Sequence, residues 1–387
     1  MLNVFSHSEP TAVADPYYQI FPLLDWHEIN GVTAEHDTPI PKCGDATQGT
    51  WPITYTAFVG GVADGRFGAA ALDFASHNTS ARKSFFFLDG AVAALASNVS
   101  NGRGEPGVPV AADVWTTLAS RLVAADAPGG GGLTLGFANG SSAAFVDGNY
   151  SFGGARARDV RWLHAGGVGY FPWPNASGAA AAPAVAALGV RLGEVAGDYR
   201  SIGAYSGTVR GRLLTAYLDH GDDLPPAGAA QAGFAYVVAP NVSAAQMPAL
   251  DAPSGPAGAA CLAAEPAVHG ASAADGSVAR AVFWQESGGE YDTSACGGGL
   301  LSLGLAGSAG LVVASRDGAT LNVTVAHPTR TGGAPLYVTV RGAVARGAGC
   351  SPDAARGLTV VSVALPQAPG MTGASVGVSC SVVAAYQ

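Results

Sequence analysis

Three local patterns in the chain have the residue types of known chemical sites, and each fails a requirement of that chemistry. The segment 219–223 (DHGDD) has metal-ligand side chains, but so many within five residues cannot converge on one ion, so it predicts a turn. The glycines at 129–132 have no following Lys-Ser or Lys-Thr to hold a phosphate. Ser206 lacks the Gly-x-Ser-x-Gly spacing of a nucleophile elbow.

Residues 54–90 are the most informative stretch, TYTAFVGGVADGRFGAAALDFASHNTSARKSFFFLDG. Gly pairs separate short apolar segments, the basic pair Arg82-Lys83 precedes three phenylalanines, and Asp89-Gly90 predicts a tight turn. Nearly all positive charge in the chain is arginine, because only two lysines occur. The planar guanidinium suits carboxylate and sulfate, although a GC-rich coding sequence would explain the same bias.

Composition restricts the class of protein. A chain of 387 residues with 48% hydrophobic and 12% charged residues is globular and long enough for two domains. The net charge of −9 argues against nucleic acid as a partner and means that any site for an anionic polysaccharide must be local. No apolar run reaches the roughly 18 residues that cross a bilayer, so we expect no membrane association.

Several features predict an extracellular protein. Seven of the ten asparagines are in Asn-x-Ser/Thr sequons, and we expect glycans at Asn98, Asn139, Asn149, Asn175, Asn241 and Asn322; the seventh is Asn78. Four of the five cysteines fall in the last third, where two disulfides are possible in three pairings, and Cys43 is left over. The N-terminus has no signal-peptide pattern, so we expect a secreted chain that has lost its front end.

The elements are predicted to be strands. With 55 glycines and 24 prolines, the chain is interrupted too often for ordinary helices. Short β-branched or aromatic segments predict an all-β protein. These segments are residues 54–59, 160–163, 213–218, 234–238, 311–313, 321–325, 336–340 and 358–365. The Ala run at 179–187 contains Pro183 and predicts a strand edge or loop, and residues 127–132 and 249–260 predict long loops.

A series of short motifs occurs in a family-specific order. In chain order they are Asp25-Trp26 with Ile29–Thr33, the Gly-Gly, Leu-Asp-Phe and Lys-Ser-Phe-Phe strands of residues 60–87, Leu95–Val99, Trp115–Leu118, Arg161–His164 with Gly169-Tyr170, Leu218–Gly221, Tyr236–Pro240 and Val325–Thr329. This set resembles polysaccharide lyase family 8, the hyaluronate, chondroitin AC and xanthan lyases. Asn30, Val32 and His327 depart from the family pattern.

The resemblance implies a fold and a domain plan. We expect a large antiparallel β-supersandwich of the galactose-mutarotase-like type, followed by a small C-terminal β-sandwich. A composition change near residues 288–299 marks the boundary. We therefore predict a lead-in at 1–15 that is the remnant of a preceding helical domain, a central β-domain at 16–287 and a C-terminal domain at 288–387.

The resemblance also implies a reaction and a substrate class. The family cleaves acidic, uronate-containing polysaccharides by β-elimination, which needs the uronate carboxylate neutralised, a base and an acid. In the family, an Asn, a Tyr, a His and an Arg on a helical toroid do this. We expect that toroid to be missing from this chain, and so no catalytic residue, cofactor or metal within it.

The remaining candidates would line the β-side wall of a substrate cleft. They are Glu35, His77, Asn78 and Arg82. Each has a simpler interpretation: Glu35 in a solvated turn, His77 in a surface loop, Asn78 carrying a glycan, and Arg82 with Lys83 guarding a strand edge. Three functions stay open: a lyase fragment that is inactive alone, a non-catalytic carbohydrate-binding glycoprotein, and a structural extracellular protein.

Overall fold

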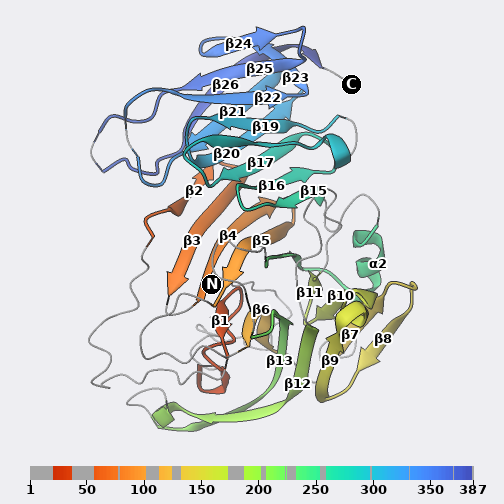
Figure 1. Ribbon diagram of the computed structural model, residues 1–387. Coiled ribbons are helices and arrows are strands. Elements are labelled where there is room, and N and C mark those ends of the chain that lie inside the picture. Colours follow the sequence, from red (N-terminus) through yellow and green to blue (C-terminus); the bar gives the residue numbers. More distant parts are fainter. Residues whose placement is uncertain are drawn as a thin grey trace.

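Four antiparallel sheets, stacked face to face, make up the part of the chain that the structure describes (Figure 1). The computed structural model describes residues 21–36, 56–76, 79–101, 113–123, 132–172, 187–201, 206–222, 224, 232–252, 259–296, 299–330, 332–368 and 370–385. Helix is limited there to α2 (Met247–Leu250) and short 3₁₀ segments at η1 (Phe21–Leu23), η3 (Gly154–Asp159), η4 (Tyr199–Ser201), η5 (Ala244–Gln246) and η7 (Ser294–Cys296). The all-β prediction is confirmed.

The first two sheets form the N-terminal half. In spatial order, the first contains β1 (Thr33–Glu35), β6 (Val114–Leu122), β13 (Thr208–Asp219), β12 (Ala187–Asp198) and β9 (Gly148–Gly153). The second contains β2 (Val59–Ala63), β3 (Gly68–Ser76), β4 (Thr79–Leu88), β5 (Ala91–Ser100), β14 (Phe234–Pro240), β11 (Val168–Phe171), β10 (Val160–Ala165), β7 (Leu133–Phe137) and β8 (Ser142–Phe145).

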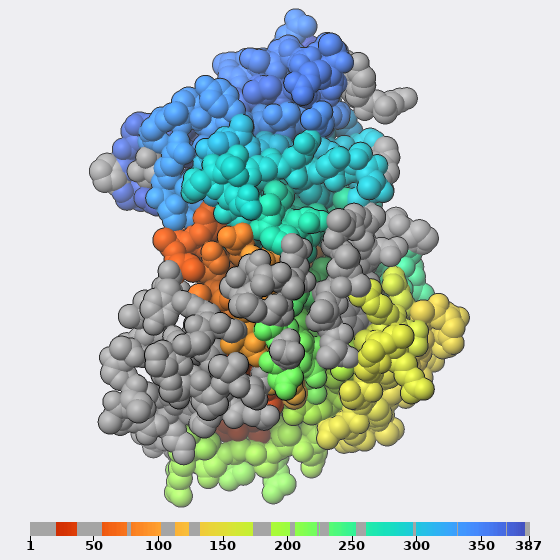
Figure 2. Space-filling model, in the orientation of Figure 1, coloured from red at the N-terminus to blue at the C-terminus, as the bar shows by residue number. Residues whose placement is uncertain are grey.

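The other two sheets form the C-terminal half, drawn in cyan and blue above the first half in Figures 1 and 2. The third contains β15 (Ala259–Ala264), β16 (Val268–Ala273), β17 (Val278–Phe283), β20 (Gly310–Asp317), β21 (Thr320–Ala326), β26 (Val376–Ala385) and β23 (Ala343–Arg346). The fourth contains β18 (Gly288–Tyr291), β19 (Ser302–Ala306), β22 (Leu336–Arg341), β25 (Leu358–Val363) and β24 (Cys350–Asp353).

Three hydrophobic cores separate the four sheets, so the two inner sheets are covered on both faces. Strand β5 shows how the sequence permits this: Ala94 and Ala96 enter the core with the first sheet, whereas Ala93 and Leu95 enter the core with the third. A strand buried on both faces has a continuous apolar sequence instead of an alternating one. The third core lies between the third and fourth sheets and includes Val323 and Val338.

The predicted strand segments agree with the structure, with two exceptions: Val59 is the only residue of the 54–59 segment within a described strand, and the 358–365 segment extends two residues past the end of β25. The division expected at residues 287 and 288 falls inside the C-terminal half. Strand β17 pairs with β20 across that position, with Ala281 opposite Val312. Hydrogen bonds of one sheet therefore join residues that the sequence assigned to different domains.

Candidate functional site

Of the four residues predicted to contact substrate, the structure describes Glu35 and Arg82, which lie on different sheets. Glu35 ends β1 and is buried, with 5% of its surface exposed. Arg82 lies on β4 and donates from Nη1 to the carbonyl of Pro266 at 2.7 Å, so it faces the third sheet. His77 and Asn78 lie outside the described residues.

The suggestion that Arg82 and Lys83 guard a strand edge is wrong. Strand β4 is an inner strand, paired with β3 on one side and β5 on the other. Successive side chains of a strand point to opposite faces. Arg82 therefore turns toward the third sheet, where its guanidinium lies 5.8 Å from the ring of Trp284, and Lys83 turns toward the first.

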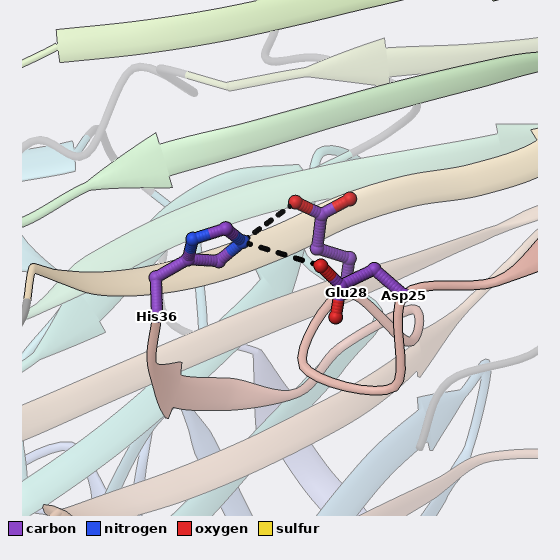
Figure 3. A group of neighbouring side chains, drawn as sticks. All are labelled: Asp25, Glu28 and His36. Atoms are coloured by element: carbon purple, nitrogen blue, oxygen red, sulfur yellow. Dashed lines mark hydrogen bonds and ion pairs between the residues drawn. The ribbon is translucent and has the colours of Figure 1, made fainter. Parts of the chain in front are cut away.

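A polar cluster not predicted from the sequence gathers beside the first sheet (Figure 3). Asp25 and Glu28 lie in the turn after η1, and His36 directly follows β1. His36 Nε2 lies 2.8 Å from Glu28 Oε1 and 3.7 Å from Asp25 Oδ2. Arg191 on β12 reaches the same Glu28 oxygen through Nη2.

Burial and charge set the protonation states of this cluster. Glu28 is 3% exposed, and its carboxylate faces the Arg191 guanidinium and the His36 imidazole. Burial opposes a charge on His36, but the hydrogen bond to Glu28 and the charges of Glu28 and Asp25 outweigh it, so the pKa of His36 is raised. The hydrogen bond from the His27 side chain lowers the pKa of Asp25 to about 2.

Aromatic rings extend the cluster across the outer face of the first sheet. The imidazole of His36 stacks on Trp115 with centroids 3.7 Å apart, and Trp115 stacks on Tyr217 at 3.8 Å. The guanidinium of Arg191 lies 5.3 Å from both of the larger rings. The ring of Tyr217 packs against Gly189, because a Cβ at position 189 would lie 2.1 Å from the Tyr217 Cζ.

The donor atoms of Asp25, Glu28 and His36 all lie within 4.8 Å of one another, a spacing that could hold a metal ion. Their own contacts compete with that use. Glu28 Oε1 already accepts from His36 and Arg191, and a guanidinium repels a bound cation. The cluster as arranged is therefore a poor cation site, and the partly exposed Arg191 side chain is its donor for an acidic or hydroxyl group.

Tyr217 and His36 do not form a proton-transfer pair in this cluster. Burial raises the pKa of the Tyr217 phenol above its usual value, so the group stays protonated at neutral pH. The ring of Trp115 lies between Tyr217 and His36. A signal for part of this site exists in the sequence, since Asp25, Glu28 and His36 lie within twelve residues; nothing local indicates that Arg191, Trp115 or Tyr217 would join them.

The two disulfides and several sequon asparagines have defined positions. Cys261 pairs with Cys296, and Cys350 pairs with Cys380, which is one of the three possible pairings. Asn139, Asn149 and Asn241 are exposed, and Asn98 is half-buried. Asn322 accepts a hydrogen bond from Ser379 Oγ within a pocket of about 360 Å³. Asn175 lies outside the described residues.

Comparisons with known proteins agree with this architecture. The family model "Polysaccharide lyase family 8, super-sandwich domain" matches residues 10–251. Chondroitinase-AC of Pedobacter heparinus is 32% identical over 92 residues, which are 23% of this chain and 12% of that protein. No helix among the described residues is both long and apolar enough to cross a membrane.

Solved structures show the same fold at low identity. A chondroitinase AC lyase superposes with a TM-score of 0.66 and 19% identity, covering 94% of this chain and 45% of that one. A Paenibacillus xanthan lyase gives 0.65 and 16%, covering 93% and 31%, and a Streptomyces coelicolor A3 chondroitin AC lyase gives 0.62 and 23%, covering 95% and 42%. This chain thus spans less than half the length of each. Because the family model covers more than half of the chain, the protein belongs to polysaccharide lyase family 8.

Proposed function

We propose that this chain contributes to β-elimination of an acidic, uronate-containing polysaccharide. The observation that carries the proposal is family membership over residues 10–251. The substrate class is supported by the similar Streptomyces coelicolor enzyme, whose structure is a complex with chondroitin sulphate. The matched relatives are much longer than this chain, so the activity of the whole protein is part of the proposal.

The role that we assign to this polypeptide is substrate binding. β-Elimination needs the uronate carboxylate neutralised before a base removes the adjacent proton. Arg191 is a cation near the outer face of the first sheet, with 36% of its side-chain surface exposed, and the pKa of the neighbouring His36 is raised, which favours its charged form. Burial raises the pKa of Tyr217, so little phenolate is present at neutral pH to act as the base. We therefore expect the purified chain to bind polysaccharide without turnover.

A second candidate function is an extracellular, non-catalytic carbohydrate-binding glycoprotein. Two disulfides favour an oxidising compartment, and the exposed sequons at Asn139, Asn149 and Asn241 are accessible to glycosylation. Both candidates predict polysaccharide binding. The two candidates differ in the activity of the complete protein. A lyase would release unsaturated product when the catalytic residues of the family are present, and a binding glycoprotein would not.

The test follows the ultraviolet absorbance of unsaturated uronate while the chain is incubated with hyaluronan, chondroitin sulphate or xanthan, with calorimetry for binding. Arg191→Ala should weaken binding about tenfold, because it removes a charge-assisted contact. The matched control is Arg161→Ala, a half-buried arginine that pairs with Asp251 away from the site. Release of product by the unaltered chain would overturn the binding-only role, and absence of binding to all three would overturn the proposed function.

A further inference from the structure

A lysine ammonium lies buried beneath the turn that carries the candidate site. Lys83 is 6% exposed. Its Nζ donates to the carbonyl of Gly31 at 2.5 Å and to Thr33 Oγ1 at 3.1 Å. No carboxylate pairs with Lys83 in the part of the chain that the structure describes, although buried lysines are rarely unpaired.

A chain of side-chain hydrogen bonds runs from this lysine to a buried histidine. Thr33 Oγ1 lies 2.8 Å from Thr116 Oγ1, and Thr116 Oγ1 lies 2.9 Å from His220 Nε2. His220 is 6% exposed, and its Nδ1 has no hydrogen-bond partner among the described residues. The chain therefore links β4, β1 and β6 to the residue that follows β13.

The protonation state of the lysine biases the direction of these hydrogen bonds. An ammonium can only donate, and a hydroxyl that accepts from a cation becomes a stronger donor, which favours each hydroxyl donating onward and His220 Nε2 accepting. The ring proton is then on Nδ1. A neutral amine can accept from Thr33, which allows the chain to reverse and His220 Nε2 to become the donor.

The surroundings place this change near neutral pH. Burial lowers the pKa of Lys83 to about 7, and burial followed by the charge of Lys83 lowers the pKa of His220 to about 3. The nearby elements present few other titratable groups: Glu35 lies on the same side of β1 as Thr33, and Tyr236 lies on β14. The pKa of Tyr236 is raised by burial, so its phenol is neutral throughout.

We propose that Lys83 is a positioning residue, whose ammonium fixes the turn before β1 through Gly31 and sets the direction of the hydrogen-bond chain to His220. Gly31 and Thr33 lie between Glu28 and His36, the two residues joined at the candidate site. Loss of the proton from Lys83 would leave a weaker hydrogen-bond donor to the Gly31 carbonyl. It would also allow the hydrogen bonds between Lys83 and His220 to reverse direction. The inference depends on the proposed function in one respect: the turn before β1 contains residues of the candidate substrate-binding site.

The chain permits an unusually clean test, because Lys42 is its only other lysine. Protein labelled with ¹⁵N at lysine Nζ gives two side-chain signals, and Lys42→Arg assigns them. We expect the Lys83 signal to titrate about three units below an ordinary lysine, and the ¹⁵N shifts of His220 to change tautomer with the same midpoint. A Lys83 midpoint near that of Lys42, or a His220 tautomer constant across the range, overturns the proposal.

Two variants separate positioning from simple structural support. Lys83→Arg keeps a permanent cation and should lock His220 in the Nδ1–H form at every pH, whereas Lys83→Met should leave its tautomer independent of pH. If Lys83→Arg does not fold, Lys83→Met decides the question. A tautomer change that persists in Lys83→Met contradicts the proposal.

Binding supplies a separate readout. The quantity to measure is the ratio of the polysaccharide affinities of the unaltered protein and Lys83→Met, because the titration of His36 is common to both and cancels in the ratio. We expect this ratio to change about threefold between roughly pH 6 and pH 9. Lys42→Met is the control and should match the unaltered protein. A constant ratio contradicts positioning of the site. Absence of polysaccharide binding in every variant contradicts the proposed function and leaves the result from nuclear magnetic resonance intact.

Discussion

At the scale of single residues, Glu28 is the group on which the candidate site depends. Its buried carboxylate accepts from both His36 and Arg191, so removing its charge leaves the guanidinium and the imidazole without their anionic partner. We expect Glu28→Gln to lower the free energy of unfolding by about 2–4 kcal/mol and to lower the pKa of His36. Denaturant unfolding and the ¹H–¹⁵N signals of His36 measure the two effects.

The pH dependence of the same variant has a definite sign. The folded state raises the pKa of His36 above 6.5, so the stabilisation from Glu28 through this histidine is complete below that pH and is lost as the pH rises through the folded pKa. Glu28→Gln should therefore cost more stability in acid than in base. Glu194→Gln, at an exposed position of β12, is the control and should show no such dependence.

We expect the burial of Lys83 to give a second pH dependence of stability, which arises from a lowered pKa instead of a raised one. Its pKa falls from 10.5 when unfolded to about 7 when folded, because of burial alone. The unfolded chain therefore takes up the proton first, and stability falls as the pH drops from 10.5 toward 7, then stays level. Lys83→Met removes this loss, so its stability relative to the unaltered protein should rise by about 4–5 kcal/mol over that window. Parallel stability curves would contradict the assignment.

At the scale of elements, the first sheet holds the aromatic stack through one glycine. A Cβ at position 189 on β12 would lie 2.1 Å from the Cζ of Tyr217 on β13, so Gly189→Ala must displace that ring and disturb its stacking on Trp115. We expect a loss of about 1–3 kcal/mol and a weaker near-ultraviolet circular dichroism signal. Gly193→Ala on the same strand meets nothing within 4 Å and should show neither effect.

The second disulfide joins elements of different sheets. Cys350 is on β24 of the fourth sheet, and Cys380 is on β26 of the third, 30 residues later. Replacing both with serine should lower the free energy of unfolding by about 2–4 kcal/mol, because the unfolded chain is no longer cross-linked. Thermal unfolding measures the effect. An unchanged midpoint, or a reductant that destabilises the double variant as much as the unaltered protein, would show that this disulfide contributes little.

At the scale of the whole molecule, polar contacts as well as a hydrophobic core join the two halves. His269 on β16 is fully buried, and its two nitrogens lie 2.8 Å from the hydroxyls of Ser84 and Ser97 on the second sheet. Arg82 adds its hydrogen bond to Pro266 and its contact with Trp284. The position of Arg82 therefore favours a role in joining the sheets.

Arg82→Ala tests this assignment against the substrate contact predicted from the sequence. We expect it to lower the free energy of unfolding by about 1–3 kcal/mol while the affinity for polysaccharide stays within a factor of about two. Calorimetric binding and denaturant unfolding measure the two effects on one preparation. Loss of affinity with unchanged stability would restore Arg82 as a substrate residue.

The sequence by itself determined the class of fold and the family. Strand identity depends on local properties, such as β-branched side chains between glycines and prolines, so it is visible in one chain without its partners. The family motifs are likewise short and contiguous, and residues 60–87 contain several of them. These are the features that local steric and hydrophobic preferences fix before the chain folds.

Only the tertiary structure decided what those strands bring together. Trp115 meets Tyr217, and Glu28 meets Arg191, because sheet pairing and register join positions far apart in the chain. The same pairing places β17 beside β20 and selects one disulfide arrangement from three. The burial of Lys83 is the clearest example of what the sequence could not show. Lys83 and its neighbour Arg82 point to opposite faces of one strand, and each is buried or exposed according to the sheet that packs on its face.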